Sequence, residues 1–172
     1  MRAFVGITSL CFCALLALPV YANPQSPAAK ATSKDPTMTQ HAEGTFDVKM
    51  TPLAADDATA GTAIGRFGLD KQFHGDLEAT SKGEMLSAGD PAKGTAGYVA
   101  IEHITGALHG RTGSFALQHS GTMDQGKFEL DVEVVPGSGT GELAGIAGKM
   151  NIIIAAGKHS YTFDYTLPQT AK

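Results

Sequence analysis

Two histidines, His103 and His119, stand among apolar residues in residues 98–121, YVAIEHITGALHGRTGSFALQHSG. Imidazole is the side chain whose charge changes most readily near neutral pH, and it also anchors ligands through hydrogen bonds. In an apolar interior, these histidines would either orient a ligand or act as acid/base groups with a pKa tuned by burial. The alternative is structural: each ring lies at the mouth of a barrel and bonds to backbone or water.

The stretch around both histidines is predicted to be a β-hairpin that turns near GALHG. Pairing Ile101 near Leu117 places His103 and His119 on the same inward-facing side of the hairpin. They then lie about four residues apart along the strands, too far to form one dyad without a third group. A shift of one residue would reverse the faces of one strand, so the prediction depends on the register.

Two acidic residues lie beside these candidates. Glu102 is adjacent to His103, but neighbouring residues of a strand point to opposite faces and cannot act on one substrate. We therefore expect Glu102 to be a surface carboxylate. Asp164 falls on the polar face of the last predicted strand and is expected to be solvated. No residue is assigned a catalytic role.

Residues 159–167, HSYTFDYTL, place a histidine and two tyrosines on one face of a strand. Core packing is one interpretation of this aromatic set. Buried phenols need hydrogen-bond partners, so the tyrosines are also candidate polar contacts in an apolar cavity. The candidate ligand-binding residues are His103, His119, Tyr161, Tyr165 and His159.

Neither a metal nor a cofactor is predicted. The six histidines are scattered singly, and the two cysteines, Cys11 and Cys13, lie within the first 22 residues. The segment PGSGTGELAGIAGKM contains a relaxed G-x-G-x-x-A pattern, but a strand follows it, whereas dinucleotide binding requires a helix there. Its glycines are therefore interpreted as turn and bend positions.

The elements that must hold these side chains are strands. KFELDVEV, residues 127–134, alternates apolar and polar residues, as a half-buried antiparallel strand does. The predicted strands are 43–51, 62–70, 73–80, 83–87, 96–106, 112–121, 126–135, 142–155 and 158–167, of which some neighbours are expected to fuse. Short strands at this spacing predict an all-β protein with a single closed or nearly closed antiparallel β-barrel of about eight strands.

The N-terminal segment is expected not to belong to the barrel. Residues 1–22 have a basic start, an apolar run and a small-x-small site ending at Ala22, the pattern of a cleavable signal peptide. We expect cleavage after Ala22 and a periplasmic or secreted protein without a membrane anchor. Residues 23–40 are predicted to be a disordered linker, 41–168 the barrel and 169–172 a tail.

The charge pattern limits the partners of the chain. The formal net charge is −4, and no basic stripe appears along the sequence. A protein that binds nucleic acid or anionic lipid carries such a stripe, so neither is an expected partner. A small apolar molecule and a second copy of the chain remain as expected partners.

Several motifs resemble the bacterial domain-of-unknown-function family 3224. These motifs are YVAIEHITGALHGRTGSFALQHSGTM, VVPGSGTGELAGIAGKM and HSYTFDYTL, with TFDVKMTPL and KQFHGDLEATSKGEML in support. The similarity covers residues 43–167 and implies a small antiparallel barrel, related in shape to allene oxide cyclase and avidin-like calycin barrels. The family has no established activity, so the resemblance assigns no catalytic residue. At the position of His103 the family usually has a basic residue, often arginine.

Three functions fit these observations. The favoured hypothesis is a non-catalytic binding module for a small apolar ligand, because small barrels either fill their interior or leave room for one molecule. The first alternative is an isomerase- or cyclase-like enzyme that needs only one or two polar groups. The second is a packed barrel that acts in interaction or assembly. Whether the protein is an enzyme is left open, with binding preferred.

Overall fold

The computed structural model describes residues 38–57 and 59–168, which contain the whole predicted barrel apart from Ala58. The predicted signal peptide at 1–22, residues 23–37 of the predicted linker and the tail at 169–172 lie outside the described residues. Within the described ranges, no helix is both long and apolar enough to span a membrane.

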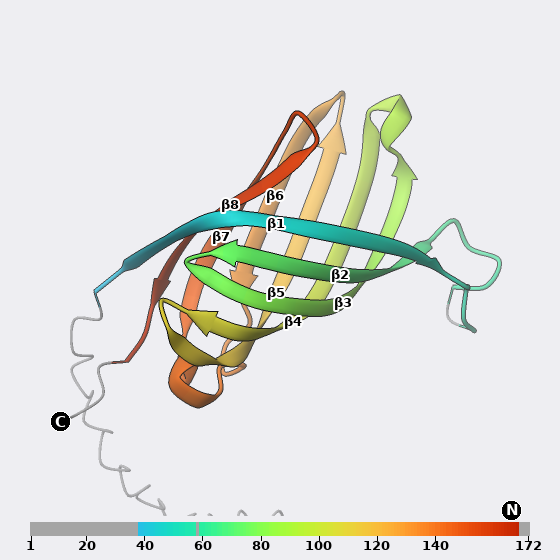
Figure 1. Cartoon of the computed structure of the whole chain (residues 1–172). Coiled ribbons are helices and arrows are strands. Elements are labelled where there is room, and N and C mark those ends of the chain that lie inside the picture. Colours follow the sequence, from blue (N-terminus) through green and yellow to red (C-terminus); the bar gives the residue numbers. More distant parts are fainter. Residues whose placement is uncertain (1–37, 58, 169–172) are drawn as a thin grey trace, which may run out of the picture. The chain divides into compact units, whose positions relative to one another are not determined.

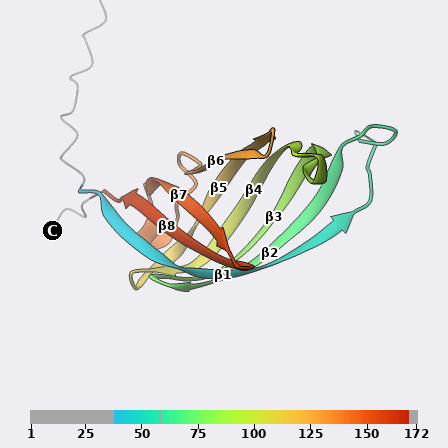
Figure 2. The same ribbon diagram turned by 90° about the horizontal axis from the view of Figure 1, so that it is seen from above.

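Eight antiparallel strands form a closed barrel in chain order, with β1 also paired to β8 (Figures 1 and 2). The strands are β1 (Gln40–Leu53), β2 (Gly65–Gly75), β3 (Leu77–Asp90), β4 (Thr95–Leu108), β5 (Arg111–Asp124), β6 (Lys127–Val134), β7 (Ala147–Ala155) and β8 (Lys158–Thr166). Two short 3₁₀ helices, Pro91–Lys93 and Gly141–Leu143, lie in the connections. The predicted all-β class and eight-stranded barrel are confirmed.

The boundaries differ from the prediction most in β2, β3 and β7, which begins at Ala147 and not at residue 142, after a short 3₁₀ helix. The chain turns at Gly75, where φ is 106°, and not before residue 73. The predicted strand 73–80 is therefore divided between β2 and β3. The predicted strand 83–87 is part of β3. Gly83 lies within β3 and does not end the strand. It is opposite Glu102 of β4, and a Cβ atom there would be 2.7 Å from the Glu102 Cα. Glycine is required at this position by close packing.

The β4–β5 hairpin has a register one residue away from the predicted one. Its two-residue turn is His109–Gly110, and both residues have positive φ, 49° and 77°, as a type I′ hairpin turn requires. His119 therefore lies opposite Ala100. The prediction that His103 faces the interior was wrong, because its side chain is exposed. The prediction that Glu102 is a surface carboxylate was also wrong, because Glu102 points inward and is fully buried.

One end of the barrel is filled by aromatic rings. Phe163 stacks between Phe115 and Tyr165, with ring centroids 5.8 and 5.3 Å apart. Phe73 meets Tyr161 edge to face at 5.7 Å. All five side chains are buried, and they interdigitate as in an ordinary protein core. We call this part of the barrel the filled end.

The two tyrosine hydroxyls close the filled end. The Tyr161 hydroxyl accepts a hydrogen bond from the N–H of Leu77, the first residue of β3, at 2.9 Å. The Tyr165 hydroxyl bonds to His109 Nδ1 at 2.8 Å and donates to Gln40 Oε1 at 3.1 Å. The phenols thus tie the turns at this end to the core.

The barrel wall has one weak seam. Between β6 and β7 the ladder consists of a single pair, Glu133 with Lys149, within the part of the chain that the structure describes. Lys149 Nζ also reaches the Asp131 carboxylate at 2.8 Å. Every other neighbouring pair of strands is joined by a longer ladder.

Candidate functional site

A cavity occupies the other end of the barrel, which we call the open end. The turns that join β3 to β4 and β5 to β6 lie at this end, at the top of Figure 1. The inner cavity has a volume of about 260 Å³. Its lining residues are Phe46, Val48, Met50, Leu69, Lys71, Met85, Tyr98, Ala100, His119, Phe128, Leu130, Ile152, Ile154 and His159. A mouth of about 480 Å³ adjoins it and shares Met50, Met85, Tyr98 and Phe128 with it.

Four polar side chains form a buried cluster at this cavity. Lys71, Ser81, Glu102 and His119 come from β2, β3, β4 and β5, so each adjacent strand contributes one inward-facing member. Glu102 Oε1 accepts hydrogen bonds from Lys71 Nζ at 2.7 Å and His119 Nε2 at 2.8 Å. Glu102 Oε2 accepts one from the Ser81 hydroxyl at 2.6 Å. Glu102 is therefore the centre of the cluster.

The partners of Glu102 decide its charge. Burial by itself would raise the pKa of the Glu102 carboxyl. The hydrogen bond from His119, the positive charge of Lys71, the charge of His119 and the hydrogen bond from Lys71 act in the opposite direction and lower this pKa to about 2. Glu102 is thus an anion at neutral pH. The Lys71 ammonium also lies over the rings of Phe46 and Phe73, 5.0 and 5.8 Å from their centroids.

Glu102 also fixes the orientation of His119. An ionised carboxylate only accepts hydrogen bonds, so His119 Nε2 carries the hydrogen that points at Glu102. In a neutral imidazole, Nδ1 is then an acceptor. Every fully buried side-chain nitrogen or oxygen of the described residues has a partner, and no hydrogen bond of Nδ1 is found among them, so Nδ1 is not fully buried. His119 lines the interior cavity and also borders a hollow on the outer face. Because its ring points inward to Glu102, we infer that Nδ1 is reached from the cavity.

Comparison with known proteins places this barrel in a family. The family model described as "Protein of unknown function (DUF3224)" matches residues 42–165. The chain belongs to the DUF3224 family. The predicted membership and barrel are thus confirmed. A search of curated proteins gave no match.

A solved structure of another DUF3224 member is similar to this chain. It is a protein of unknown function from Shewanella oneidensis MR-1, 51% identical in sequence, with a TM-score of 0.70. The match covers 78% of this chain and 100% of the Shewanella chain. The relative carries no assigned activity, so the function of this DUF3224 barrel has to be argued from its site.

The predicted ligand-binding residues fall in three places of the DUF3224 barrel. His119 and His159 line the cavity, and the His159 ring lies 5.1 Å from that of Phe46. Tyr161 and Tyr165 lie at the filled end, where their hydroxyls bond to the protein. His103 lies on the outer face of β4. Only the two cavity histidines are therefore brought together, and the binding role of all five residues stays a prediction.

Sequence reasoning missed Lys71, Ser81 and Glu102. A signal for Lys71 was present, because Leu69, Lys71 and Phe73 alternate and place a lysine on an apolar face. An ammonium in such a position needs a buried anion. Searching for that anion would have found Glu102, which lies between Ala100 and Ile104 on the same alternating pattern of β4.

The cluster offers proton donors and acceptors rather than a metal site. Within residues 38–57 and 59–168, no group of three His, Cys, Asp or Glu side chains is placed to hold a metal ion. Lys71 presents a positive charge to the cavity, and His119 presents an acceptor nitrogen. Each of these side chains can orient a polar group of a bound molecule, and an imidazole can also move a proton to or from it.

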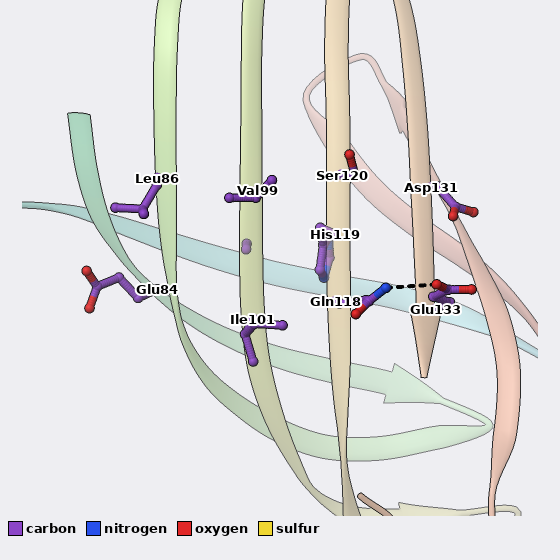
Figure 3. A pocket seen from close by; sticks show the side chains of 10 residues that line it. Glu84, Leu86, Val99, Ile101, Gln118, His119, Ser120, Asp131 and Glu133 are labelled. Atoms are coloured by element: carbon purple, nitrogen blue, oxygen red, sulfur yellow. Dashed lines mark hydrogen bonds between the residues drawn. The ribbon is translucent and has the colours of Figure 1, made fainter. Parts of the chain in front are cut away.

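A second hollow lies on the outer face of β3 to β6 and has a volume of about 470 Å³ (Figure 3). Leu86, Val99 and Ile101 line it and are 39%, 54% and 53% exposed. At its edge Gln118 donates a hydrogen bond of 2.8 Å to Glu133. The carboxylates that line this hollow lie at the surface, and of the buried cluster only His119 borders it, whereas both Lys71 and His119 line the interior cavity. We therefore take the interior cavity as the candidate site.

Proposed function

We propose that this DUF3224 barrel is a non-catalytic binding module that takes a small, largely apolar molecule into the cavity at its open end. The observation that carries the proposal is the contrast between a filled end and a hollow end in one barrel. Ligand pockets are mostly apolar, with a few polar groups that fix orientation. The cavity has that composition.

The size of the cavity supports a small ligand. Its inner part, about 260 Å³, lies just below the ~300–1,000 Å³ of typical ligand sites, and the mouth adds to it. An unfilled interior lowers stability because its lining loses van der Waals contacts. A bound apolar molecule would restore those contacts. A packed barrel with a role in assembly would not need this space.

A fluorescent probe tests the proposal directly. N-phenyl-1-naphthylamine is uncharged, and its fluorescence rises when it leaves water. We expect saturable binding to the wild-type protein and its loss in Ala100→Phe, because Ala100 lines the cavity and a phenyl ring there occupies the space. Val99→Phe adds the same ring to the outer face of β4 and is the matched control.

Two results would contradict the proposal. One is the absence of saturable probe binding to folded wild-type protein. The other is equal loss of binding in Ala100→Phe and Val99→Phe, which would place the probe outside the cavity. Native mass spectrometry of protein purified from its own cells complements the probe, because a natural ligand would add a reproducible mass that solvent extraction removes.

We also propose that the mature protein is periplasmic or secreted. The support is the signal-peptide pattern that ends at Ala22. The same mass spectra test it, because cleavage after Ala22 gives a chain that begins at Asn23. A full-length chain in the cytoplasmic fraction would refute this localisation.

An isomerase- or cyclase-like activity is the second candidate, and one observation favours it. In a neutral imidazole His119 Nδ1 is an acceptor oriented by Glu102, and Lys71, which lines the same cavity, carries an ammonium that can stabilise a developing oxyanion. Such an enzyme would exchange ligand C–H hydrogens with solvent. Incubation of the extracted natural ligand with protein in D₂O would show a mass gain that His119→Gln abolishes. Unchanged ligand mass leaves binding as the function.

A further inference from the structure

We propose that the polar end of the ligand is an oxygen acceptor, a carbonyl or a carboxylate, that takes a hydrogen bond from the Lys71 ammonium. This inference rests on the proposed binding function and adds the chemical class of the ligand: an apolar chain that ends in such an oxygen and carries no cationic group. Three features support it, namely the composition of the cavity wall, the sign of the charge beside the cavity, and the remaining N–H donors of Lys71.

The first feature is the composition of the cavity wall. The chain has 17 Asp and Glu residues, yet none of them is among the described residues that line the cavity and its mouth. The polar lining residues are Lys71, Ser87, Tyr98, His119 and His159. The outer hollow differs, because Glu84, Asp131 and Glu133 line it. A ligand in the interior cavity therefore meets side chains that can donate hydrogen bonds, and no lining carboxylate that could hold a cation.

The second feature is the sign of the charge beside the cavity. Glu102 is the anion of the buried cluster, and the Lys71 ammonium, 2.7 Å from its Oε1, balances it. A neutral His119 leaves the cluster at zero charge and a protonated His119 makes it positive, so it is negative in neither state. His159 and Tyr98 add no negative charge, because burial raises the pKa of the Tyr98 phenol. A ligand ammonium would lose its hydration here without gaining a counter-ion, which is costly.

The third feature is the hydrogen-bond capacity of Lys71. An ammonium has three N–H donors, and Nζ makes one hydrogen bond to a protein acceptor, Glu102 Oε1, among the described residues. Nζ also lies 5.0 Å from the ring centroid of Phe46, another lining residue, so the ammonium lies at the surface of the cavity. The Lys71 side chain is only 6% exposed. A group inside the cavity is therefore the partner within reach of the remaining donors.

A ligand that fills the cavity has to satisfy this ammonium. Displacing water from beside Nζ by a group that cannot replace its hydrogen bond lowers affinity. A hydrocarbon end or an ammonium would leave the N–H donors without an acceptor, and that loss is larger for a charged donor than for a neutral one. A carbonyl or carboxylate oxygen accepts the bond, and charge-assisted hydrogen bonds are the stronger kind. The rest of the ligand would lie against the apolar lining, which includes Val48, Leu130 and Ile152.

Three competitors of nearly equal size test the inference. We would measure displacement of N-phenyl-1-naphthylamine by 2-nonanone, octanoate and nonylammonium at pH 5.5 and pH 8.5, on either side of the ordinary pKa of histidine. We expect 2-nonanone to bind about tenfold or more tightly than nonylammonium at both pH values, because it brings an acceptor and no cation. Octanoate identifies the source of the oxygen: tighter binding than 2-nonanone indicates a carboxylate, and weaker binding a carbonyl. Nonylammonium that matches or exceeds 2-nonanone at either pH would overturn the inference.

A double variant removes the donor without leaving a buried charge unpaired. Lys71→Met combined with Glu102→Gln replaces the ion pair by neutral side chains of similar size. The affinity for 2-nonanone should fall about tenfold, because its hydrogen bond to a charged donor is lost. Lys49→Met makes the same change at an exposed position of β1 and should leave the affinity unchanged. Wild-type affinity for 2-nonanone in the folded double variant would refute the role of Lys71.

The carbonyl stretch of bound 2-nonanone supplies a second readout on the wild-type protein. A hydrogen bond from an ammonium lowers this infrared frequency, so we expect it to lie below the frequency of the ketone in hexane. Equal frequencies would mean that the bound oxygen has no donor and would overturn the inference. Circular dichroism and thermal melting establish whether the double variant is folded, and the infrared result decides if it is not.

The outcomes separate the two proposals. If the probe binds but nonylammonium competes as well as 2-nonanone, the acceptor inference fails while cavity binding stands. If the probe does not bind to folded wild-type protein, cavity binding fails and the acceptor inference fails with it.

Discussion

The two ends of this barrel are built from the same strands but follow different packing rules. At the filled end, Phe73, Phe115 and Phe163 are fully buried and their rings contact one another or a tyrosine. At the open end the inward positions hold Met50 and Phe128, which are 49% and 51% exposed. An alternating strand thus specifies a face but not whether the space in front of that face is filled.

The polar groups show the same contrast. At the filled end, the Tyr161 and Tyr165 hydroxyls are used up by the protein's own turns and side chains. At the open end, Lys71 and His119 keep hydrogen-bond capacity that faces a cavity. Folding accounts for the first set completely. The second set is satisfied only in part, and this difference is why we propose the open end as the functional one.

The largest expected effect breaks the packing of the filled end. Phe163→Ala removes a ring stacked between two others and should lower the free energy of unfolding by about 3–5 kcal/mol. Phe128→Ala, at the open end, should cost about 1 kcal/mol, because the ring is half exposed and stacks mainly on Tyr98. Urea denaturation measures both. Equal costs would mean that the open end is packed as tightly as the filled one.

The next effect concerns the charge of Glu102. Its pKa is about 2 in the folded protein against an ordinary value of 4.5, so the ionised form stabilises the fold by about 3 kcal/mol. A lowered pKa gives stability that is present above pH 4.5 and lost as the pH falls towards 2. Urea denaturation from pH 6 to pH 2.5 should therefore show Glu102→Gln approaching the wild-type stability at low pH. A gap that stays constant would contradict this prediction.

A smaller effect distinguishes a tyrosine hydroxyl that bonds to the protein at the filled end from one at the cavity. Tyr161→Phe leaves the Leu77 N–H without its acceptor and should lower the free energy of unfolding by about 1–3 kcal/mol. Tyr98→Phe removes a hydroxyl at the cavity and should change it by less than about 0.5 kcal/mol. Thermal melting compares the two variants. A larger loss of stability in Tyr98→Phe than in Tyr161→Phe would contradict the closing role of the Tyr161 hydroxyl.

The smallest effect concerns the two histidines of the β4–β5 hairpin. His103 is exposed, and its hydrogen-bond partner is Thr105 at 3.4 Å. His103→Gln should change stability by less than about 0.5 kcal/mol and leave probe affinity intact. His119→Gln removes a ring from the cavity lining and should weaken binding of the probe. Titration of both variants decides the point, and loss of binding in His103→Gln would show that the outer face is the site.

Much of the fold could be predicted because alternation is a direct consequence of strand geometry. KFELDVEV gave β6 to within a residue, since every second side chain of a strand faces the core. The β4–β5 register could not be fixed in the same way. Its turn uses His109 in the left-handed region, a position where Asn or Asp is the usual signal, and an error of one residue exchanged Glu102 with His103.

The site was harder to predict for a different reason. Its members come from four strands, and only their register shows that Lys71, Ser81, Glu102 and His119 meet. The cavity depends on the volumes of side chains from many strands at once, which no local pattern contains. His119 was predicted as an inward candidate and does line the cavity. Its partner Glu102 was assigned to the surface because the adjacent residue had been assigned to the interior.

The single ladder pair between β6 and β7 has a consequence for local opening of the barrel wall. Separating these two strands breaks far fewer backbone hydrogen bonds than opening any other part of the barrel. Local opening there needs only a fraction of the global free energy of unfolding. In D₂O, seam-facing amides of β6 and β7 should exchange early, while those of β3 and β4 wait for global unfolding. The barrel thus resembles a curled sheet whose two edges are joined by one residue pair, and its diameter can adapt to what it encloses.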